Sequence, residues 1–206
     1  MRDSDKAYEI MLQLLVAGDL RGGQAIDDQW LQGKTGVGKT PMREALLRLV
    51  QDGYVTSVPH AGMIVTSYDI AQLNSMLNIR SVLQELLSKA LVQNARDEDI
   101  DAFEGEMRSR LTLEDPISTH AISDADAYFH HTLRTLSGDS ILSSILNKLE
   151  TMSGIALHPH LQDYFFDAKR VGGEYFQIIS LMRNRDQEGL TAALRRHIPK
   201  YGLQYG

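Results

Sequence analysis

The sequence contains no cysteine, only one tryptophan and no long apolar run. Without thiols the chain forms no disulfide, no thiolate metal site and no cysteine nucleophile, and this suits a reducing compartment. The first residues are charged and then amphipathic, unlike a secretory signal peptide. No stretch approaches the length of a membrane span. We therefore expect a cytoplasmic protein with no membrane partner.

The chain of 206 residues has an ordinary hydrophobic fraction of 43%, enough for one large domain or two small ones. Its net charge of -6 argues at first against a nucleic-acid partner. Residues 34–60, however, carry four basic against two acidic side chains, whereas residues 67–206 carry 14 basic against 19 acidic. A small basic segment on an acidic body suits a regulator whose larger part does something other than hold DNA.

The stretch from Gly33 to Leu49, GKTGVGKTPMREALLRL, fits two incompatible patterns. The phosphate-loop motif G-x-x-x-x-G-K-[ST] of nucleotide triphosphatases is matched by Gly33, Gly38, Lys39 and Thr40. That motif follows a buried apolar strand, but the residues before Gly33 are DDQWLQ, polar and helical in pattern. The downstream chain also lacks the alternation of strands and helices that such folds require, so we reject the phosphate loop.

Helical spacing recurs three times in the first part of the chain. Apolar side chains at intervals of three and four predict one helix over residues 7–16. Asp27 is a suitable N-cap for a second, short helix, in which Trp30 and Leu31 face the core. Thr40 is a suitable N-cap for a third helix, which carries its own apolar stripe.

A hairpin follows the third helix. Tyr54–Val58 and Met63–Thr66 read as strands joined by a tight tip, PHAG. The order helix, helix, turn, helix and hairpin is that of a winged helix-turn-helix, whose third helix enters the DNA major groove while the wing lies near the backbone or the minor groove. We therefore predict a winged helix-turn-helix domain over residues 1–66.

The run GVGKTPMREALLRLVQDGYV, followed by VPHAGMIV, resembles the DNA-binding domain of the GntR family of bacterial transcription regulators. The resemblance implies a set of residues that reach double-stranded DNA: Gln29, Lys39, Thr40, Arg43, His60 and Gly62. Lys39 stands where the family more often has Arg. The ammonium group of Lys39 therefore takes the place of a guanidinium group, which can bind guanine through two parallel hydrogen bonds.

After Thr66 no strand pattern recurs, and apolar spacing predicts about six helices. They are expected over residues 69–95, 97–113, 123–136, 141–156, 163–182 and 186–197. The short breaks between them imply antiparallel neighbours in a bundle. The predicted fold class is therefore mainly α: a winged helix-turn-helix over residues 1–66, and an all-α domain for effector binding and dimerisation over residues 67–206.

Two features of the second part point to a binding site. Asp126 and His130 are four residues apart, so a carboxylate and an imidazole lie on one helical face. The pair is either half of a metal site or a buried hydrogen-bonded pair. Arg80 lies within the apolar run LNIRSVLQELL, where it either extends to solvent or meets an anion inside the bundle.

The run DADAYFHHTLRTLSGDSIL resembles the FCD effector domain of the FadR-type branch of the GntR family. The resemblance implies a divalent metal such as zinc held by Asp126, His130 and His197, and an acidic effector that meets Arg80. Where the family usually has a further His ligand, this chain has Tyr175. A neutral phenol is a poor ligand. Either the three remaining residues hold the ion with water or effector, or the pocket is metal-free and Tyr175 hydrogen-bonds the effector.

We therefore predict a ligand-responsive bacterial transcription regulator that is not an enzyme. It is expected to act as a homodimeric repressor that binds operator DNA and responds to a small organic or sugar acid. The alternative is a metal-dependent helical-bundle enzyme with an appended winged-helix domain. That alternative requires a general base or a second carboxylate beside Asp126, and no sequence motif supplies one.

Overall fold

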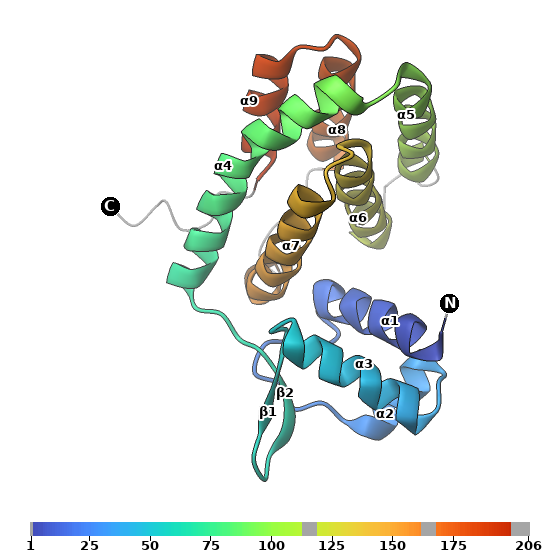
Figure 1. Ribbon diagram of the computed structural model, residues 1–206, viewed down its shortest axis with the longest axis vertical. Helices are drawn as coiled ribbons and strands as arrows, with labels where there is room; N and C mark the ends of the chain where they lie inside the picture. The colour runs from blue at the N-terminus through green and yellow to red at the C-terminus, as the bar shows by residue number, and fades with distance from the viewer. Residues whose placement is uncertain (1, 113–118, 162–167, 199–206) are drawn as a thin grey trace. The chain divides into compact units, whose positions relative to one another are not determined.

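The computed structural model describes residues 2–112, 119–161 and 168–198. In chain order the elements are α1 (Asp3–Ala17), α2 (Asp28–Thr35), α3 (Lys39–Gln51), β1 (Val55–Val58), β2 (Gly62–Val65), α4 (Ile70–Asn94), α5 (Asp97–Thr112), α6 (Thr119–Leu136), α7 (Ser140–Leu161), α8 (Ala168–Arg183) and α9 (Gln187–His197) (Figure 1). The predicted fold class is confirmed: a mainly α chain with one small hairpin. Among the described helices, none is both long and apolar enough to cross a bilayer.

The chain forms two compact units. Unit 1 holds the residues up to Leu73 and the end of α7 from Thr151 on, and unit 2 holds Asn74–Glu150 together with α8 and α9. The helix α7 therefore contributes residues to both units.

Unit 1 has the predicted winged helix-turn-helix order. Its core includes Met11 and Leu15 of α1, Leu31 of α2, and Leu46 and Leu49 of α3, all nearly or completely buried. Burial of each such side chain contributes about 1.5–3 kcal/mol. The apolar stripe of α3 is therefore what fixes the opposite, polar face of this helix at the surface.

The helix starts in unit 1 agree only in part with the prediction. Asp27 caps α2 as predicted, because its side chain accepts hydrogen bonds from the backbone N–H groups of Gln29 and Trp30. The predicted N-cap at Thr40 is wrong, since α3 begins at Lys39 after an N-cap at Gly38. The carbonyl of Gly38 already accepts the N–H of Met42, so Thr40 lies inside the first turn.

The orientation predicted for Trp30 is also wrong. Leu31 is completely buried, whereas Trp30 is 38% exposed. Neighbouring residues on a helix point about 100° apart, so both side chains cannot face the same core on a helix this short. The ring of Trp30 instead lies under the ammonium group of Lys34, with 5.5 Å between Nζ and the ring centroid.

The predicted hairpin is confirmed. Strands β1 and β2 pair antiparallel, with Val55 opposite Val65 and Val58 opposite Gly62. Both His60 and Gly62 have positive φ angles, of 64° and 85°. These left-handed conformations reverse the chain within the tip.

Unit 2 is the predicted helical bundle. Its core joins Phe103 of α5, Phe129 of α6, Leu146 of α7, Tyr175 of α8 and Leu190 of α9. Some helix limits differ from those expected: α6 begins at residue 119, not 123, and α7 continues to residue 161. The predicted end of one helix at residue 113 and the predicted start of another at residue 163 lie outside the described residues.

Two helices of unit 2 lie antiparallel. At one end, the side-chain amide of Asn94 in α4 donates to the carbonyl of Ser137, just before α7, at 2.6 Å. Further along, Arg80 of α4 lies 3.8 Å from Glu150 of α7. Residues later in α7 thus meet residues earlier in α4, as in an antiparallel pair (Figure 1).

This pair of helices also carries the exposed large apolar side chains of the described part of unit 2: Ile79, Val82 and Leu86 of α4, and Ile141 and Ile145 of α7. We call these five side chains the apolar face. Val82 and Leu86 belong to the apolar pattern that predicted α4, yet they are 69% and 55% exposed. Part of that pattern therefore marks a surface and not the core.

Candidate functional site

The six residues implied to reach DNA are all exposed on unit 1: Gln29, Lys39, Thr40, Arg43, His60 and Gly62. Three of them, Lys39, Thr40 and Arg43, share the first turns of α3, opposite its buried stripe. Gln29 lies in the first turn of α2, and the remaining two form the hairpin tip. The fold thus supplies three separate exposed elements, with the start of α3 holding most of the predicted donors.

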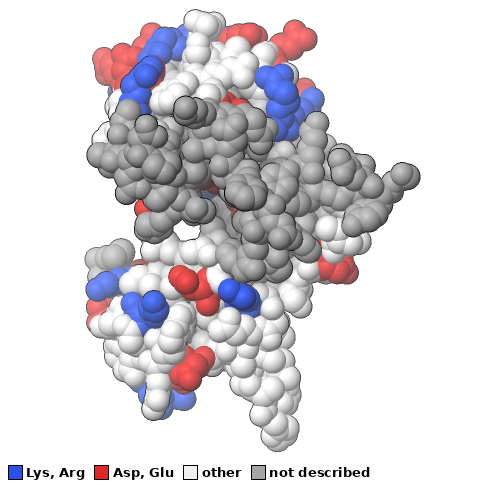
Figure 2. All heavy atoms as spheres, turned by 180° about the vertical axis from the view of Figure 1, so that it is seen from behind, with Lys and Arg blue, Asp and Glu red and all other residues white. Residues whose placement is uncertain are grey.

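On the face of unit 1 that Figure 2 displays, Lys and Arg alternate with Asp and Glu and form no broad basic surface, and the hairpin projects without charge. Between Val55 and Val65 the sequence has no Lys, Arg, Asp or Glu. One basic residue of α3, Arg48, pairs with Asp5 at 2.9 Å and lies 4.2 Å from the ring centroid of Tyr8. Arg48 is therefore engaged in holding α3 to α1.

In unit 2 the predicted metal residues come together. Asp126 and His130 lie on α6, and His197 is the last residue of α9. Both imidazoles direct Nε2 toward Oδ1 of Asp126, at 3.6 Å for His130 and 3.7 Å for His197. The three potential ligand atoms all lie within 4.8 Å of one another. We call these residues the Asp-His-His cluster.

Two carboxylates that no sequence pattern predicted lie on the outer side of the imidazoles. Nδ1 of His130 is 3.4 Å from Oε1 of Glu150, and Nδ1 of His197 is 3.2 Å from Oε2 of Glu174. A carboxylate on Nδ1 fixes the tautomer that leaves Nε2 as an electron-pair donor, which is the usual arrangement around metal-binding histidines. Glu174 therefore contacts a candidate metal ligand, His197, through Nδ1 and does not itself take the place of a ligand.

The donor set fits a zinc-like ion. Zinc takes carboxylate oxygen and imidazole nitrogen at about 2.0–2.2 Å, and in sites that react with a further molecule it commonly has three protein ligands and one open position. The cluster offers one oxygen and two nitrogens at compatible separations. Water or a ligand oxygen would complete the shell.

Tyr175 stands where the resemblance implied a further His ligand. It is completely buried, and its hydroxyl donates to Oδ1 of Asp126 at 2.8 Å. Burial, followed by the negative charge of Asp126, raises the pKa of the Tyr175 phenol far above its usual range. Its ring packs against Phe129, with 4.5 Å between centroids. The neutral phenol therefore acts here as a donor that orients Asp126.

The cluster is electrostatically coupled. Burial would raise the pKa of Asp126, but the imidazoles of His130 and His197 outweigh this and hold it below its ordinary value. Burial would likewise lower the pKa of His197, but hydrogen bonding and charge from Asp126 and then Glu174 raise it above its ordinary value. Asp126 and Glu174 therefore favour a positive charge on His197.

Arg80 is one of two arginines at the edge of the cluster. It is 5% exposed, and its Nη2 lies 3.8 Å from Oε1 of Glu150. Arg134, one turn after His130 on α6, donates from Nη1 to the other oxygen of Glu150. We call Arg80 and Arg134 the guanidinium pair. Burial lowers the pKa of Arg80, and the charge of Glu150 opposes this.

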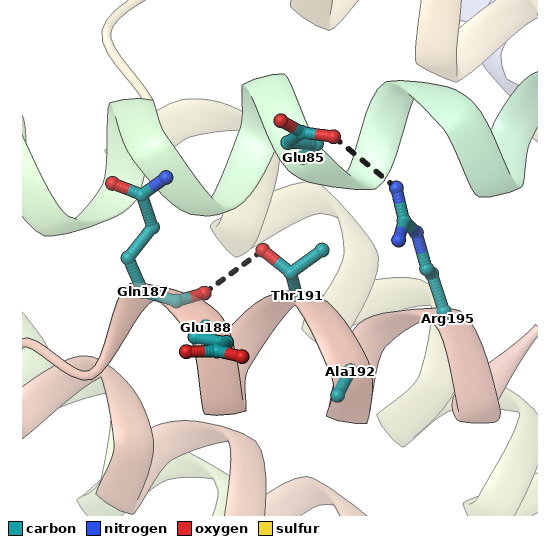
Figure 3. A pocket seen from close by; sticks show the side chains of 6 residues that line it. All are labelled: Glu85, Gln187, Glu188, Thr191, Ala192 and Arg195. Atoms are coloured by element: carbon teal, nitrogen blue, oxygen red, sulfur yellow. Dashed lines mark hydrogen bonds and ion pairs between the residues drawn. The ribbon is translucent and has the colours of Figure 1, made fainter.

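A separate open depression of about 480 Å³ lies between α4 and α9 (Figure 3). It is lined by Glu85, Gln187, Glu188, Thr191, Ala192 and Arg195. Arg195 reaches across it to Glu85 at 3.3 Å, and the hydroxyl of Thr191 donates to the carbonyl of Gln187 at 2.8 Å. None of the predicted site residues lines this depression, so the chemistry of unit 2 is concentrated at the Asp-His-His cluster.

A winged helix-turn-helix followed by a helical unit is the architecture of a DNA-binding transcription regulator. The chain belongs to the GntR family: residues 3–65 match the family of bacterial regulatory proteins, gntR family, and residues 75–199 match the FCD domain. These are domains of transcription regulators and not of enzymes, as the names of the relatives agree. The predicted family is therefore confirmed, and the enzyme alternative is set aside.

Several relatives span nearly the whole chain. The Nta operon transcriptional regulator of Aminobacter aminovorans is 25% identical over 193 residues, which cover 91% of this chain and 87% of the relative. McbR, an HTH-type transcriptional regulator of Escherichia coli strain K12, is 23% identical over 186 residues, which cover 87% of this chain and 82% of the relative. The solved structure of E. coli McbR/YncC matches with a TM-score of 0.85 at 20% identity, over 96% of this chain and 94% of that one. A likeness at this identity concerns the fold alone.

Proposed function

We propose that this regulator is a homodimeric, ligand-responsive repressor. Unit 1 binds operator DNA, and unit 2 binds a small organic or sugar acid with the help of a divalent ion such as zinc, in the cytoplasm. The observation that carries the proposal is the Asp-His-His cluster beside the buried guanidinium pair. The cluster offers a carboxylate and two imidazoles to a cation, and an ion held there, together with the nearby guanidinium groups, would attract an acidic ligand.

For DNA, the start of α3 is proposed as the reading element. Lys39 and Arg43 would contact base edges or phosphates from the first turns, with Thr40 between them and Gln29 on the preceding helix. The tip of the hairpin, at His60 and Gly62, would lie in or beside the minor groove. The tip is uncharged apart from the imidazole when protonated, so its contribution would come from shape and hydrogen bonds.

For the effector, the ion and Arg80 are proposed as the two anchors. The ion would be held by Asp126, His130 and His197, and it would supply Lewis-acid attraction for a carboxylate or hydroxyl oxygen. Arg80 would provide a planar donor for an acidic group. Tyr175 would hold Asp126 in place and lie beside the bound effector.

For the homodimer, the apolar face of α4 and α7 is the proposed contact. Large exposed apolar side chains that gather on two paired helices are typical of interaction surfaces. A two-fold interface uses the same patch on both copies. Two-fold symmetry would present two α3 helices to the two halves of a palindromic operator.

The DNA part of the proposal is tested by measuring the shift of promoter DNA from upstream of the protein's own gene at several salt concentrations. The doubly substituted Lys39→Ala, Arg43→Ala protein is expected to bind at least about tenfold more weakly, because removing a side chain that contacts a base or a phosphate costs about 1–3 kcal/mol. Arg96→Ala, which removes an exposed charge just before α5, is the control and should bind as the wild type does. If the double variant bound DNA as tightly as the wild type, Lys39 and Arg43 would not be DNA contacts.

A further inference from the structure

One carboxylate in unit 2 already occupies the position that an acidic ligand would take. Glu150 meets Arg134 through one oxygen, and meets both Arg80 and His130 through the other, at 3.8 and 3.4 Å. A single carboxylate thus joins the anion-binding part of the site to the outer side of a candidate metal ligand.

The burial of these groups makes the contact a built part of the site. The side-chain exposures are 6% for Arg80, 13% for Arg134 and 14% for Glu150. They come from three helices, α4, α6 and α7, and therefore depend on the packing of unit 2. Two guanidiniums around one carboxylate is also the contact by which arginines bind an acidic ligand.

We propose that Glu150 is the specificity-determining residue of this site: it serves as a built-in carboxylate on the guanidinium pair, so the site accepts ligands with one carboxylate and disfavours those with two. The inference rests on the proposed effector function of the site. A ligand with one carboxylate places it between the ion and Arg80, while Glu150 stays on Arg134. A second carboxylate on the ligand would compete with Glu150 for the same arginines.

The balance of charge leads to the same conclusion. A divalent ion and the guanidinium pair bring four positive charges, against three negative charges on Asp126, Glu150 and Glu174, when both imidazoles are neutral. One positive charge remains, which a monoanion neutralises. A dianion would leave a net negative charge in a partly buried place next to Glu150, and like charges in such contact are strongly unfavourable.

The test compares butyrate with succinate, which share a four-carbon chain and differ by one carboxylate. Calorimetric titrations of the zinc-loaded, full-length protein give the affinity ratio of succinate to butyrate. The wild type is expected to prefer butyrate. Glu150→Gln is expected to shift the ratio toward succinate by about tenfold or more, because the guanidinium pair then lacks its carboxylate.

Two further variants make the result specific. The double variant Glu150→Gln, Arg134→Gln removes one buried charge of each sign and so guards against misfolding of the single variant. In this variant Glu150 no longer contacts Arg80 either, so the affinity ratio of succinate to butyrate should again be higher than in the wild type. Glu85→Gln removes a carboxylate from α4 at the separate depression, and should keep the wild-type ratio.

An unchanged ratio in both Glu150 variants would overturn the role of Glu150 while leaving the effector site standing. An equal shift in Glu85→Gln would also overturn it, because the effect would then reflect overall charge. Failure of every zinc-loaded protein to bind either acid would instead refute the proposed effector function, and this inference with it.

Discussion

At the scale of single residues, the main departure from the family pattern is Tyr175. The sequence places a phenol where an imidazole ligand is usual, and the structure gives that phenol a defined contact, a hydrogen bond to Asp126. Tyr175 is thus a hydrogen-bond donor that orients Asp126. A site with three ligands retains an additional coordination position for a ligand oxygen.

Restoring the imidazole should strengthen metal binding. Tyr175→His is expected to raise zinc affinity by about tenfold or more, because a third imidazole nitrogen would join the cluster as a fourth ligand. Competition with a chromophoric chelator measures this directly. Tyr175→Phe is the matched control: it removes only the hydroxyl and should not gain affinity. A histidine variant that folds, as judged by circular dichroism, and yet binds zinc no better than the phenylalanine variant would contradict this account.

The raised pKa of His197 predicts how stability depends on pH. A group whose folded-state pKa is raised stabilises the fold fully below its unfolded pKa, about 6.5 for His, and loses that contribution as pH rises through the folded value. Metal binding needs the neutral imidazole and so strengthens over the same range. The zinc-induced increase in Tm should therefore be larger at pH 8 than at pH 6.

Thermal unfolding with and without zinc at both pH values gives the measurement. Other groups titrate in this window, so His197→Gln provides the comparison. The wild type without metal should lose its stability advantage over this variant as pH rises. A zinc-induced increase that is the same at pH 6 and pH 8 in the wild type would be inconsistent with a proton at His197 competing with the ion.

At the scale of elements, caps and apolar stripes determine how α2 and α3 are presented. Asp27 caps α2 with two hydrogen bonds, of 2.8 and 2.9 Å. The buried stripe of α3 leaves Lys39, Thr40 and Arg43 on its outer side. The order of these elements follows from the sequence alone, but the first residue of α3 does not, because Gly38 and Thr40 are both acceptable there.

Loss of the cap on α2 should weaken unit 1. Asp27→Ala is expected to destabilise the fold by about 1 kcal/mol, since the N–H groups of Gln29 and Trp30 lose their acceptor. Asp28→Ala removes the neighbouring carboxylate, which accepts no such capping bond, and should cost less. Chemical denaturation of the full-length variants compares the two. Equal losses would mean that charge near the helix start, and not the capping geometry, is what matters.

Which residues of the cluster can be predicted from the sequence depends on whether they share a helix. Asp126 and His130 follow from the spacing within one helix, and the family resemblance added His197. Glu150 lies on a different helix, and no local spacing connects it with the others. Arg134 continues the i, i+4 series from Asp126 and His130 along α6. The same spacing, followed for one more turn, would have predicted that Arg134 lies on the face of α6 that carries the cluster.

At the scale of the whole molecule, the proposed DNA recognition and the proposed ligand sensing belong to different units, and α7 contributes residues to both. The fold class follows from the sequence because the helical spacing and the hairpin tip are local signals. The exposure of Val82 and Leu86 does not, since an apolar stripe looks the same in sequence whether it faces a core or another molecule.

The apolar face predicts the assembly state. Val82→Glu places a charge at its most exposed position on α4 and is expected to convert a dimer to a monomer at micromolar concentration, because an unpaired charge is costly in an apolar interface. Light scattering coupled to size exclusion gives the mass. Ser109→Glu, on the exposed side of α5, should leave the mass unchanged. A wild type that is monomeric from the outset would refute the proposed contact.

The central claim is that ligand occupancy of unit 2 alters the affinity of unit 1 for DNA. The most direct measurement is the anisotropy of labelled operator DNA titrated with zinc-loaded protein, with and without a saturating small carboxylic acid. The wild type should change affinity about fivefold or more, the usual lower range of coupling between sites, and Arg80→Gln should not respond. An operator affinity that stays the same in the wild type while calorimetry shows the acid bound would contradict the account.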